Sequence, residues 1–353
     1  MTIGLGLSQR ETGILDSIPE PVVIVDNQRA VVAVNTAAGR EIGVGYAGRA
    51  LALSLRHPVA LAAVDDVLSR GVSRSVEVTF RTPTQRTYAM LAAPLQSATG
   101  TASEGAVLVF HDVTSERRAQ QMRADFVANA SHELRSPLSA IVGFIETLRG
   151  PAKDDAAARA RFLDVMAQEA ARMTKLVEDL LSLSAIEADK HVAPQGKVEV
   201  ARLLQRVTEA LQGRAEARSV RMSVELRDAV PDVAGDADQL AQVFRNLIEN
   251  AINYGRPDTD VRVTARAVDR VGETTRSGVA ITVEDEGEGI APDHIPRLTE
   301  RFYRVDPGRS RKLGGTGLGL AIVKHILNRH RGRLSIASDV GRGSRFTVTL
   351  PAA

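Results

Sequence analysis

The sequence predicts a multidomain α+β protein with three parts. Short β-branched runs bounded by turn residues fill the first third, two long helices with apolar periodicity follow, and helices then alternate with strands to the end. These patterns indicate an antiparallel-sheet domain, a helical hairpin that forms a dimeric four-helix bundle, and an α/β-sandwich domain. Their expected limits are residues 1–114, 115–192 and 193–353.

Composition excludes several classes of protein. The 45 basic and 43 acidic residues nearly balance, which argues against a nucleic-acid partner. The absence of cysteine excludes disulfides and thiolate zinc sites and fits a reducing cytosol. No run approaches the roughly 18 apolar residues of a membrane span. We therefore expect no transmembrane segment in this chain and a cytoplasmic location, free or at the inner face of the cytoplasmic membrane.

The first part shows five candidate strands. PVVIVDNQRAVVAVN contains two β-branched runs around the turn Asp26-Asn27, and SVEVTF, TYAMLAAPL and GAVLVFHDVT supply three more. This order, with VDNQRAVVAVNTAA and the closing HDVT, resembles a PAS domain. The resemblance implies a sheet that either binds a ligand or couples structurally to its neighbour. His57 and His111 are possible haem ligands, but isolated histidines are more often structural or solvated.

A helix is expected from Ser115 onward, because SERRAQQMRADF contains neither glycine nor proline. It would run directly into FVANASHELRSPL. The apolar residues of this region recur at steps of four and three, which is the pattern of a packing seam: Leu134, Leu138, Ile141, Ile145 and Leu148. His132 and Ser136 fall outside this seam, as i, i+4 neighbours on the solvent side. A lone exposed histidine is usually only a solvated polar residue.

The context changes that interpretation. SHELRSPL resembles the phospho-accepting box of sensor histidine kinases, and FVANASHELRSPLSAIVGFIETLRGP resembles the PhoR type, which controls phosphate-regulon genes. The resemblance implies that His132 carries the phosphoryl group. Glu133 is suited to accept a proton from the ring and to select its tautomer. Ser136 occupies the place of a Thr or Asn that orients water for dephosphorylation, and Pro137 predicts a bend beside the acceptor.

Gly150-Pro151 ends this helix, and a second follows within DDAAARARFLDVMAQEAARMTKLVEDLLSLSAIEAD. Its seam residues are Met166, Met173, Leu176, Leu180 and Leu183. Two helices form only a hairpin, whose apolar stripes need more partner surface. A homodimer that completes a four-helix bundle is therefore expected.

The third part contains the helix GDADQLAQVFRNLIENAINYG, in which Asp236 and Gln239 have capping-box spacing. Its expected buried stripe is Leu240, Val243, Phe244, Leu247, Ile248 and Ala251. Three asparagines, poor helix formers, share another face and suggest a polar task, although they could be ordinary surface residues: Asn246, Asn250 and Asn253.

NLIENAINY resembles the N box of histidine kinases. The resemblance implies that the Asn250 carboxamide binds Mg²⁺ and that Asn246 and Tyr254 contact ATP. Asn253 stands where the family usually has a lysine or arginine aimed at phosphate, so its role is left open.

A strand is expected in VAITVEDEGEGI, which ends at Asp285 and is followed by Gly287 and Gly289. A carboxylate can accept a hydrogen bond from the adenine amino group, and glycines allow the backbone to approach the base. DxGxG alone could be an ordinary turn. Its place after the N box matches the kinase family.

GGTGLGLAIVKHIL is a glycine-rich loop leading into a helix, where backbone N–H groups can hold phosphates. It is neither a P-loop nor a dinucleotide fingerprint. It resembles the second glycine box of the kinase, gyrase and Hsp90 superfamily, which implies ATP contacts at Gly315, Thr316, Gly317, Leu318 and Gly319. Upstream, Tyr303 and Arg304 open a basic tract that resembles an ATP lid.

The resemblance covers nearly the whole chain and implies a dimeric sensor histidine kinase. ATP with Mg²⁺ would phosphorylate His132, and the phosphoryl group would pass to an aspartate on the receiver domain of a separate response regulator. Two alternatives are an ATP-dependent conformational clamp, as in gyrase or Hsp90 relatives, and a catalytically silent scaffold.

Overall fold

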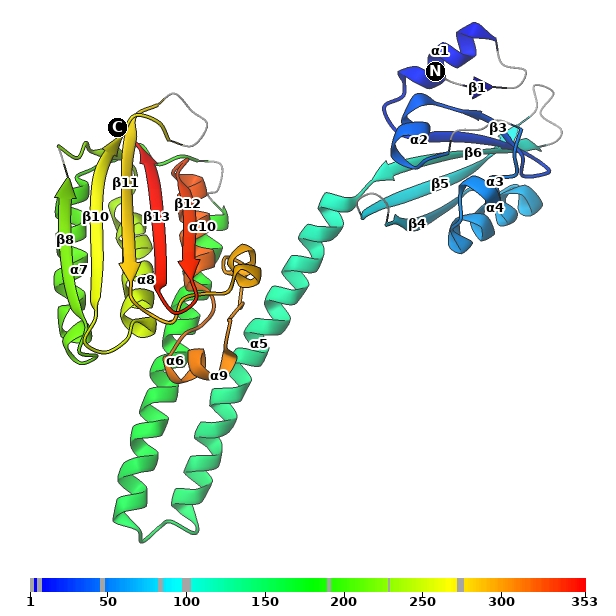
Figure 1. Ribbon diagram of the computed structural model, residues 1–353. Helices are drawn as coiled ribbons and strands as arrows, with labels where there is room; N and C mark the ends of the chain where they lie inside the picture. The colour runs from blue at the N-terminus through cyan, green and yellow to red at the C-terminus, as the bar shows by residue number, and fades with distance from the viewer. Residues whose placement is uncertain are drawn as a thin grey trace. The chain divides into compact units, whose positions relative to one another are not determined.

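The computed structural model describes residues 3–4, 8–44, 48–81, 85–96, 103–188, 192–227, 229–271 and 276–353. The chain divides into two compact units, Met1–Val127 and Ala128–Ala353 (Figure 1). Each unit has its own sheet.

The described strands of the first unit form a six-stranded antiparallel sheet in the order β1-β3-β2-β6-β5-β4. The strands are β1 (Ile3–Gly4), β2 (Val22–Asp26), β3 (Val31–Val34), β4 (Arg74–Phe80), β5 (Arg86–Gln96) and β6 (Ser103–Asp112). The helices are α1 (Gln9–Ser17), α2 (Thr36–Glu41), α3 (Leu51–Ser54) and α4 (Pro58–Arg70). All five strands expected from the sequence are confirmed.

The core of this unit lies between the sheet and helices α2 to α4. Fully buried aromatic and aliphatic side chains from both layers fill it, among them Leu51, Leu55, Tyr88, Met90, Leu108 and Phe110. Of the two histidines considered above, His57 packs beside the ring of Phe80, and exposed His111 pairs with Glu20 at 3.0 Å. Each therefore has ordinary structural surroundings.

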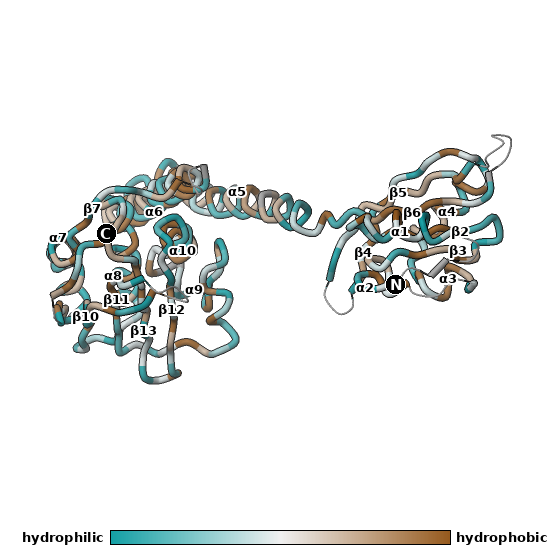
Figure 2. The backbone as a smooth tube through the Cα atoms, turned by 90° about the horizontal axis from the view of Figure 1, so that it is seen from above, coloured by the Kyte–Doolittle hydropathy of each residue, from teal (hydrophilic) through white to brown (hydrophobic). Residues whose placement is uncertain are grey.

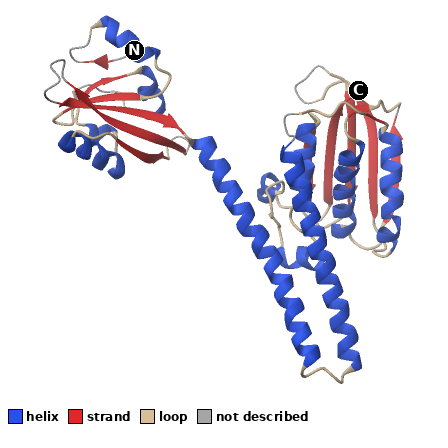
Figure 3. Ribbon diagram, turned by 180° about the vertical axis from the view of Figure 1, so that it is seen from behind, coloured by secondary structure: helices blue, strands red, loops and turns tan. Residues whose placement is uncertain are grey.

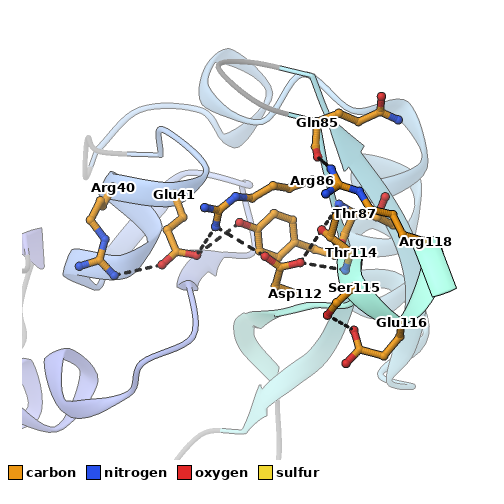
Figure 4. Close-up of polar contacts among 11 residues, drawn as sticks. Arg40, Glu41, Gln85, Arg86, Thr87, Asp112, Thr114, Ser115, Glu116 and Arg118 are labelled. Carbon is orange, nitrogen blue, oxygen red and sulfur yellow. Dashed lines mark hydrogen bonds and ion pairs between the residues drawn. The ribbon is translucent and has the colours of Figure 1, made fainter. Parts of the chain in front are cut away.

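A polar network joins the end of β6 to the start of the next helix, α5 (Thr114–Arg149) (Figure 4). Asp112 accepts hydrogen bonds from the backbone N–H and the hydroxyl of Thr114. Arg86 lies 3.5 Å from both Asp112 and Glu41, and the buried Tyr88 hydroxyl donates to Glu41. The carboxylate of the HDVT segment thus connects the first turn of α5 to the sheet and to α2.

The second unit contains a helical hairpin made by α5 and α6 (Ala156–Ala188). The helix α5 continues through Pro137. The rings of Phe144 and Phe162 stack across the hairpin at 5.1 Å, and Leu176 and Leu183 of the predicted seam are buried. Other apolar side chains, 40–66% exposed, remain uncovered on the two helices: Leu138, Val142, Ile145, Leu163, Val177 and Leu181. Figure 2 shows the mixture of hydrophobic and hydrophilic positions along α5 and α6.

The rest of this unit is a two-layer α/β sandwich, as predicted. Its five described sheet strands have the order β12-β13-β11-β10-β8, with β8 parallel to β10 and the other pairs antiparallel. They are β8 (Arg221–Arg227), β10 (Asp260–Val268), β11 (Gly278–Asp285), β12 (Arg333–Asp339) and β13 (Gly343–Pro351). The helices α7 (Val200–Glu216), α8 (Ala237–Tyr254) and α10 (Gly319–Arg329) cover one face (Figures 1 and 3).

Short elements complete the sandwich. They are β7 (Lys197–Val198), β9 (Val233–Ala234), the 3₁₀ helix η1 (Pro292–Arg297) and α9 (Pro307–Lys312). The strand expected in VAITVEDEGEGI is β11, and its side chains Val279, Ile281 and Val283 are buried against the helical layer. Within the described ranges, no helix has both the length and the apolarity needed to cross a membrane.

Candidate functional site

A cavity of about 250 Å³ lies where α8, the loop after β11, the segment around α9 and the glycine-rich loop before α10 meet. Most of the predicted nucleotide residues line it: Asn246, Asn250, Asn253, Tyr254, Asp285, Gly289, Tyr303, Arg304, Gly315, Thr316, Gly317 and Gly319. Two predicted residues lie outside this lining. Gly287 donates its backbone N–H to Asp285, and the Leu318 side chain is fully buried.

Helix α8 presents one face to the core and another to the cavity. The predicted apolar stripe is buried: Leu240, Val243, Phe244, Leu247, Ile248 and Ala251. Asp236 caps the helix by accepting the N–H groups of Asp238 and Gln239. The reciprocal half of the expected capping box is replaced, because the Asp236 N–H donates to Nε2 of His330 at 3.0 Å. Burial lowers the pKa of His330, which keeps the neutral, accepting imidazole in place.

The three asparagines of α8 have different surroundings on the cavity wall. The amide of Asn246 donates to the carbonyl of Gly319 at the first turn of α10, at 3.3 Å. Asn250 makes no side-chain hydrogen bond to another described residue, so its amide oxygen is available. Mg²⁺ often binds one or two protein oxygens and completes its shell with water and phosphate oxygens. The amide oxygen of Asn250 could be such a ligand. Asn253 accepts from Arg214 at 3.2 Å, so a guanidinium lies beside the position at which the resemblance led us to expect a cation.

Asp285 lies at the end of β11, where it is 8% exposed and lines the cavity. Burial raises the pKa of its carboxyl to about 6, although hydrogen bonds from the backbone of Gly287 and Ser344 favour the charged form. A buried acceptor at a cavity wall suits recognition of an amino group. The site thus fits the adenine contact expected from the sequence.

Two glycines have backbone positions that no other residue could fill. Gly317 has φ of 75°, and a Cβ built there would lie 2.9 Å from Phe302, which itself has φ of 63° and donates its N–H to the Gly317 carbonyl. Gly289 has φ of 72°, and its Cβ would lie 2.1 Å from the Asp339 carbonyl oxygen. These close approaches shape two walls of the cavity.

The segment that resembles an ATP lid is held against the cavity by polar contacts. The hydroxyls of Tyr254 and Ser310 lie 2.9 Å apart and connect α8 to α9. The Tyr303 hydroxyl lies 2.6 Å from Nδ1 of His294, and the Arg297 guanidinium lies 4.3 Å from the centre of the Tyr303 ring. The predicted lid residues therefore belong to the cavity wall.

The expected acceptor segment lies on α5. His132 and Ser136 are exposed, as the seam pattern predicted. The Glu133 side chain is 19% exposed and is paired with two arginines. Its Oε2 accepts from Arg172 of α6 at 2.8 Å, and Arg304 reaches both of its oxygens, at 3.2 and 2.9 Å. The expected proton acceptor is thus occupied by guanidinium groups.

Two cavity residues of α6 were not expected from the sequence. Lys175 and Asp179 line the cavity. The Thr316 hydroxyl donates to Asp179 at 2.7 Å, and Lys175 pairs with Glu249 at 2.7 Å. Burial raises the pKa of Asp179. These contacts join residues more than 70 positions apart, so only a signal from pairs of positions could have indicated them.

Models of three domain families match the chain. They are a PAS fold at residues 15–118, the His Kinase A (phospho-acceptor) domain at 122–189, and the histidine kinase-, DNA gyrase B- and HSP90-like ATPase at 235–353. The matches follow the order of the sheet domain, the hairpin and the sandwich.

Curated relatives show the same likeness. The phosphate regulon sensor protein PhoR of Pseudomonas aeruginosa is 42% identical over 241 residues, which are 68% of this chain and 53% of that protein. Sensor protein kinase WalK of Staphylococcus saprophyticus is 35% identical over 247 residues, 70% of this chain and 39% of that protein. The chain spans about half the length of the curated relatives it matches.

A solved structure of the histidine kinase ThkA in complex with the response regulator protein TrrA has a TM-score of 0.53 at 18% identity. The match covers 98% of this chain and 99% of that chain, and it supports the fold alone.

A PAS fold, a phospho-acceptor hairpin and an ATP-binding sandwich in this order define the sensor histidine kinases of two-component systems, and the chain belongs to that family. Within the family it is of the PhoR type, as the likeness to the Pseudomonas aeruginosa sensor shows. The resemblance expected from the sequence is confirmed.

Proposed function

We propose that the chain is an ATP-dependent protein-histidine kinase that phosphorylates His132. One observation carries the proposal: the N box, the aspartate loop, the lid and the second glycine box line one cavity, and Arg304 of that cavity contacts the residue next to His132. A clamp driven by ATP needs no acceptor histidine, so the contact between Arg304 and the residue next to His132 favours a kinase over a clamp.

In the proposed reaction, a ring nitrogen of His132 attacks the γ-phosphorus of ATP, and the bond to the bridging oxygen breaks to release ADP. The ring nitrogen that does not attack loses its proton to a carboxylate, for which Glu133 is the candidate. Asn250 would hold Mg²⁺, which neutralises phosphate charge when bound. The chain's own residues chiefly position the reactants: Asp285 orients the base, and the glycine loop and α10 hold the phosphates.

The reaction is tested with γ-labelled ATP and the intact chain. We expect acid-labile, base-stable label on the protein and none on His132→Gln. His111→Gln, which changes another exposed histidine, should be labelled like the unmodified chain. ATP hydrolysis without label would favour the clamp, and absence of ATP binding would favour the silent scaffold. Label retained on His132→Gln would refute the assignment.

We further propose that the phosphoryl group passes to an aspartate of a response regulator of the phosphate-regulon type. The likeness to a phosphate regulon sensor supports this choice. Because the reaction uses ATP, we expect it to take place in the cytoplasm or at the inner face of the cytoplasmic membrane. We also propose that the three domains span residues 1–114, 115–192 and 193–353. Phosphotransfer profiling against purified regulators tests the partner, since one regulator should accept label much faster than the others.

Ser136 would support the reverse function, dephosphorylation of the regulator. Its hydroxyl is exposed one turn beyond His132 on α5, where it can orient a water molecule toward a docked aspartyl phosphate. Ser136→Ala should lower the dephosphorylation rate by about tenfold or more. Ser139→Ala, which removes an exposed hydroxyl three residues farther on, should have no effect. An unchanged rate in Ser136→Ala would remove this role.

We also propose a homodimer, because both hairpin helices leave large apolar side chains uncovered. Pairing two hairpins would bury these stripes in one four-helix bundle.

A further inference from the structure

The ion cluster around Glu133 connects the acceptor helix to the cavity. The side chains are largely buried: Arg304 is 6% exposed, Arg172 11% and Glu133 19%. Arg304 also donates to the Thr316 carbonyl at 2.8 Å, within the glycine-rich loop. One guanidinium therefore contacts both the residue after His132 and a loop expected to hold phosphates.

Arg304 has capacity for another acceptor. Its side chain lines the cavity, and its buried Nε has no hydrogen-bond partner among the described residues. A buried guanidinium donor without an acceptor is unfavourable, and a phosphate oxygen is a strong acceptor for it. A nucleotide in this cavity would therefore compete with Glu133 for Arg304.

Arg172 makes such an exchange feasible. It donates to Glu133 Oε2 at 2.8 Å and also lies 3.6 Å from Glu169. If Arg304 moved to a phosphate, the Glu133 carboxylate would keep one guanidinium partner and would not become an isolated buried charge. Among the described residues, Arg304 alone donates a hydrogen bond to Oε1, so this oxygen would become available as an acceptor.

We infer that Arg304 masks Glu133 and exchanges this carboxylate for phosphate when a nucleotide binds, while Arg172 is the positioning residue that holds Glu133 on the acceptor helix. Nucleotide binding then frees Oε1 of Glu133 beside His132. The inference rests on the proposed function and adds to it a competition between an internal carboxylate and the ligand.

The test compares Mg²⁺-ADP binding to the intact chain and to Glu133→Gln by calorimetry. Removing the competing charge should increase ADP affinity about tenfold, the scale of one charge-assisted contact. Adenosine, which lacks phosphates, should bind both proteins equally. If the intact chain binds neither ligand, the proposed function itself fails. If it binds ADP but Glu133→Gln binds no more tightly, the masking contact is refuted and the proposed function stands.

Glu187→Gln is the matched control. Glu187 of α6 forms an ion pair with Arg301, so it also joins the hairpin to the sandwich, but neither residue lines the cavity. Its ADP affinity should equal that of the unmodified chain. An equal gain in Glu187→Gln and Glu133→Gln would show that loosening the hairpin is sufficient and would overturn the specific exchange. A change in adenosine affinity in Glu133→Gln would overturn it as well.

Discussion

At the scale of one residue, burial of Asp285 in the cavity wall makes the stability of the fold depend on pH. Its folded pKa is about 6, whereas an unperturbed aspartate has a value of 3.8. The folded state therefore holds the proton more tightly than the unfolded state. The resulting stability is present below pH 3.8 and is lost as the pH rises through 6. With 1.36 kcal/mol per unit, this amounts to about 3 kcal/mol.

The substitution Asp285→Asn removes this titration. Relative to the unmodified chain, the free energy of unfolding of the variant should rise by up to about 3 kcal/mol between pH 4 and pH 7.5. Calorimetry measures this change, and the unfolding transition of the sandwich is the one that added ADP shifts. The control is Asp269→Asn, which changes an exposed aspartate of the same sandwich. Parallel pH curves for Asp285→Asn and the unmodified chain would contradict the assigned cause.

At the scale of elements, the hairpin carries the prediction of dimerisation. Ile145 is 40% exposed on α5 and lies in the predicted seam. In a four-helix bundle it would be buried, and a lysine there would place an unpaired charge in the core. Ile145→Lys should weaken the dimer by a factor of about 100 or more.

Light scattering at micromolar concentration measures this change. The unmodified chain should have twice the 37.8 kDa mass of one chain, and Ile145→Lys should approach the single-chain mass. Val340→Lys, which alters a 69% exposed position of the sandwich, should remain dimeric. A monomeric unmodified chain, or a dimeric Ile145→Lys, would remove the bundle.

At the scale of the whole molecule, the sequence predicted most elements because their signals are local. The β-branched runs before Val113, the seam steps in α5 and α6, and the apolar stripe of α8 each follow from periodicity within one segment. Glycines such as Gly317 and Gly289 also lie in loops where the backbone has a positive φ. The convergence of the boxes on a cavity came from family resemblance.

The remaining features depend on pairs of residues far apart in the chain. His330 caps α8 from 94 positions away, so the motif at Asp236 suggested the wrong partner for its N–H. Asp179 is an unremarkable helical aspartate until Thr316 is placed beside it. The same is true of Glu133, whose arginine partners lie 39 and 171 positions away. Local patterns contain no information about which side chains meet across the fold.

The shared guanidinium of Arg304 has a thermodynamic corollary. ADP binding and contact between Glu133 and the His132 ring are both favoured when Arg304 leaves Glu133. The two equilibria are therefore linked, and their coupling must be reciprocal. If the nucleotide increases the affinity of the carboxylate for the ring by some factor, contact with the ring must increase the affinity for the nucleotide by the same factor. The loading of the cavity and the readiness of the acceptor would then report on each other without any movement larger than one side chain.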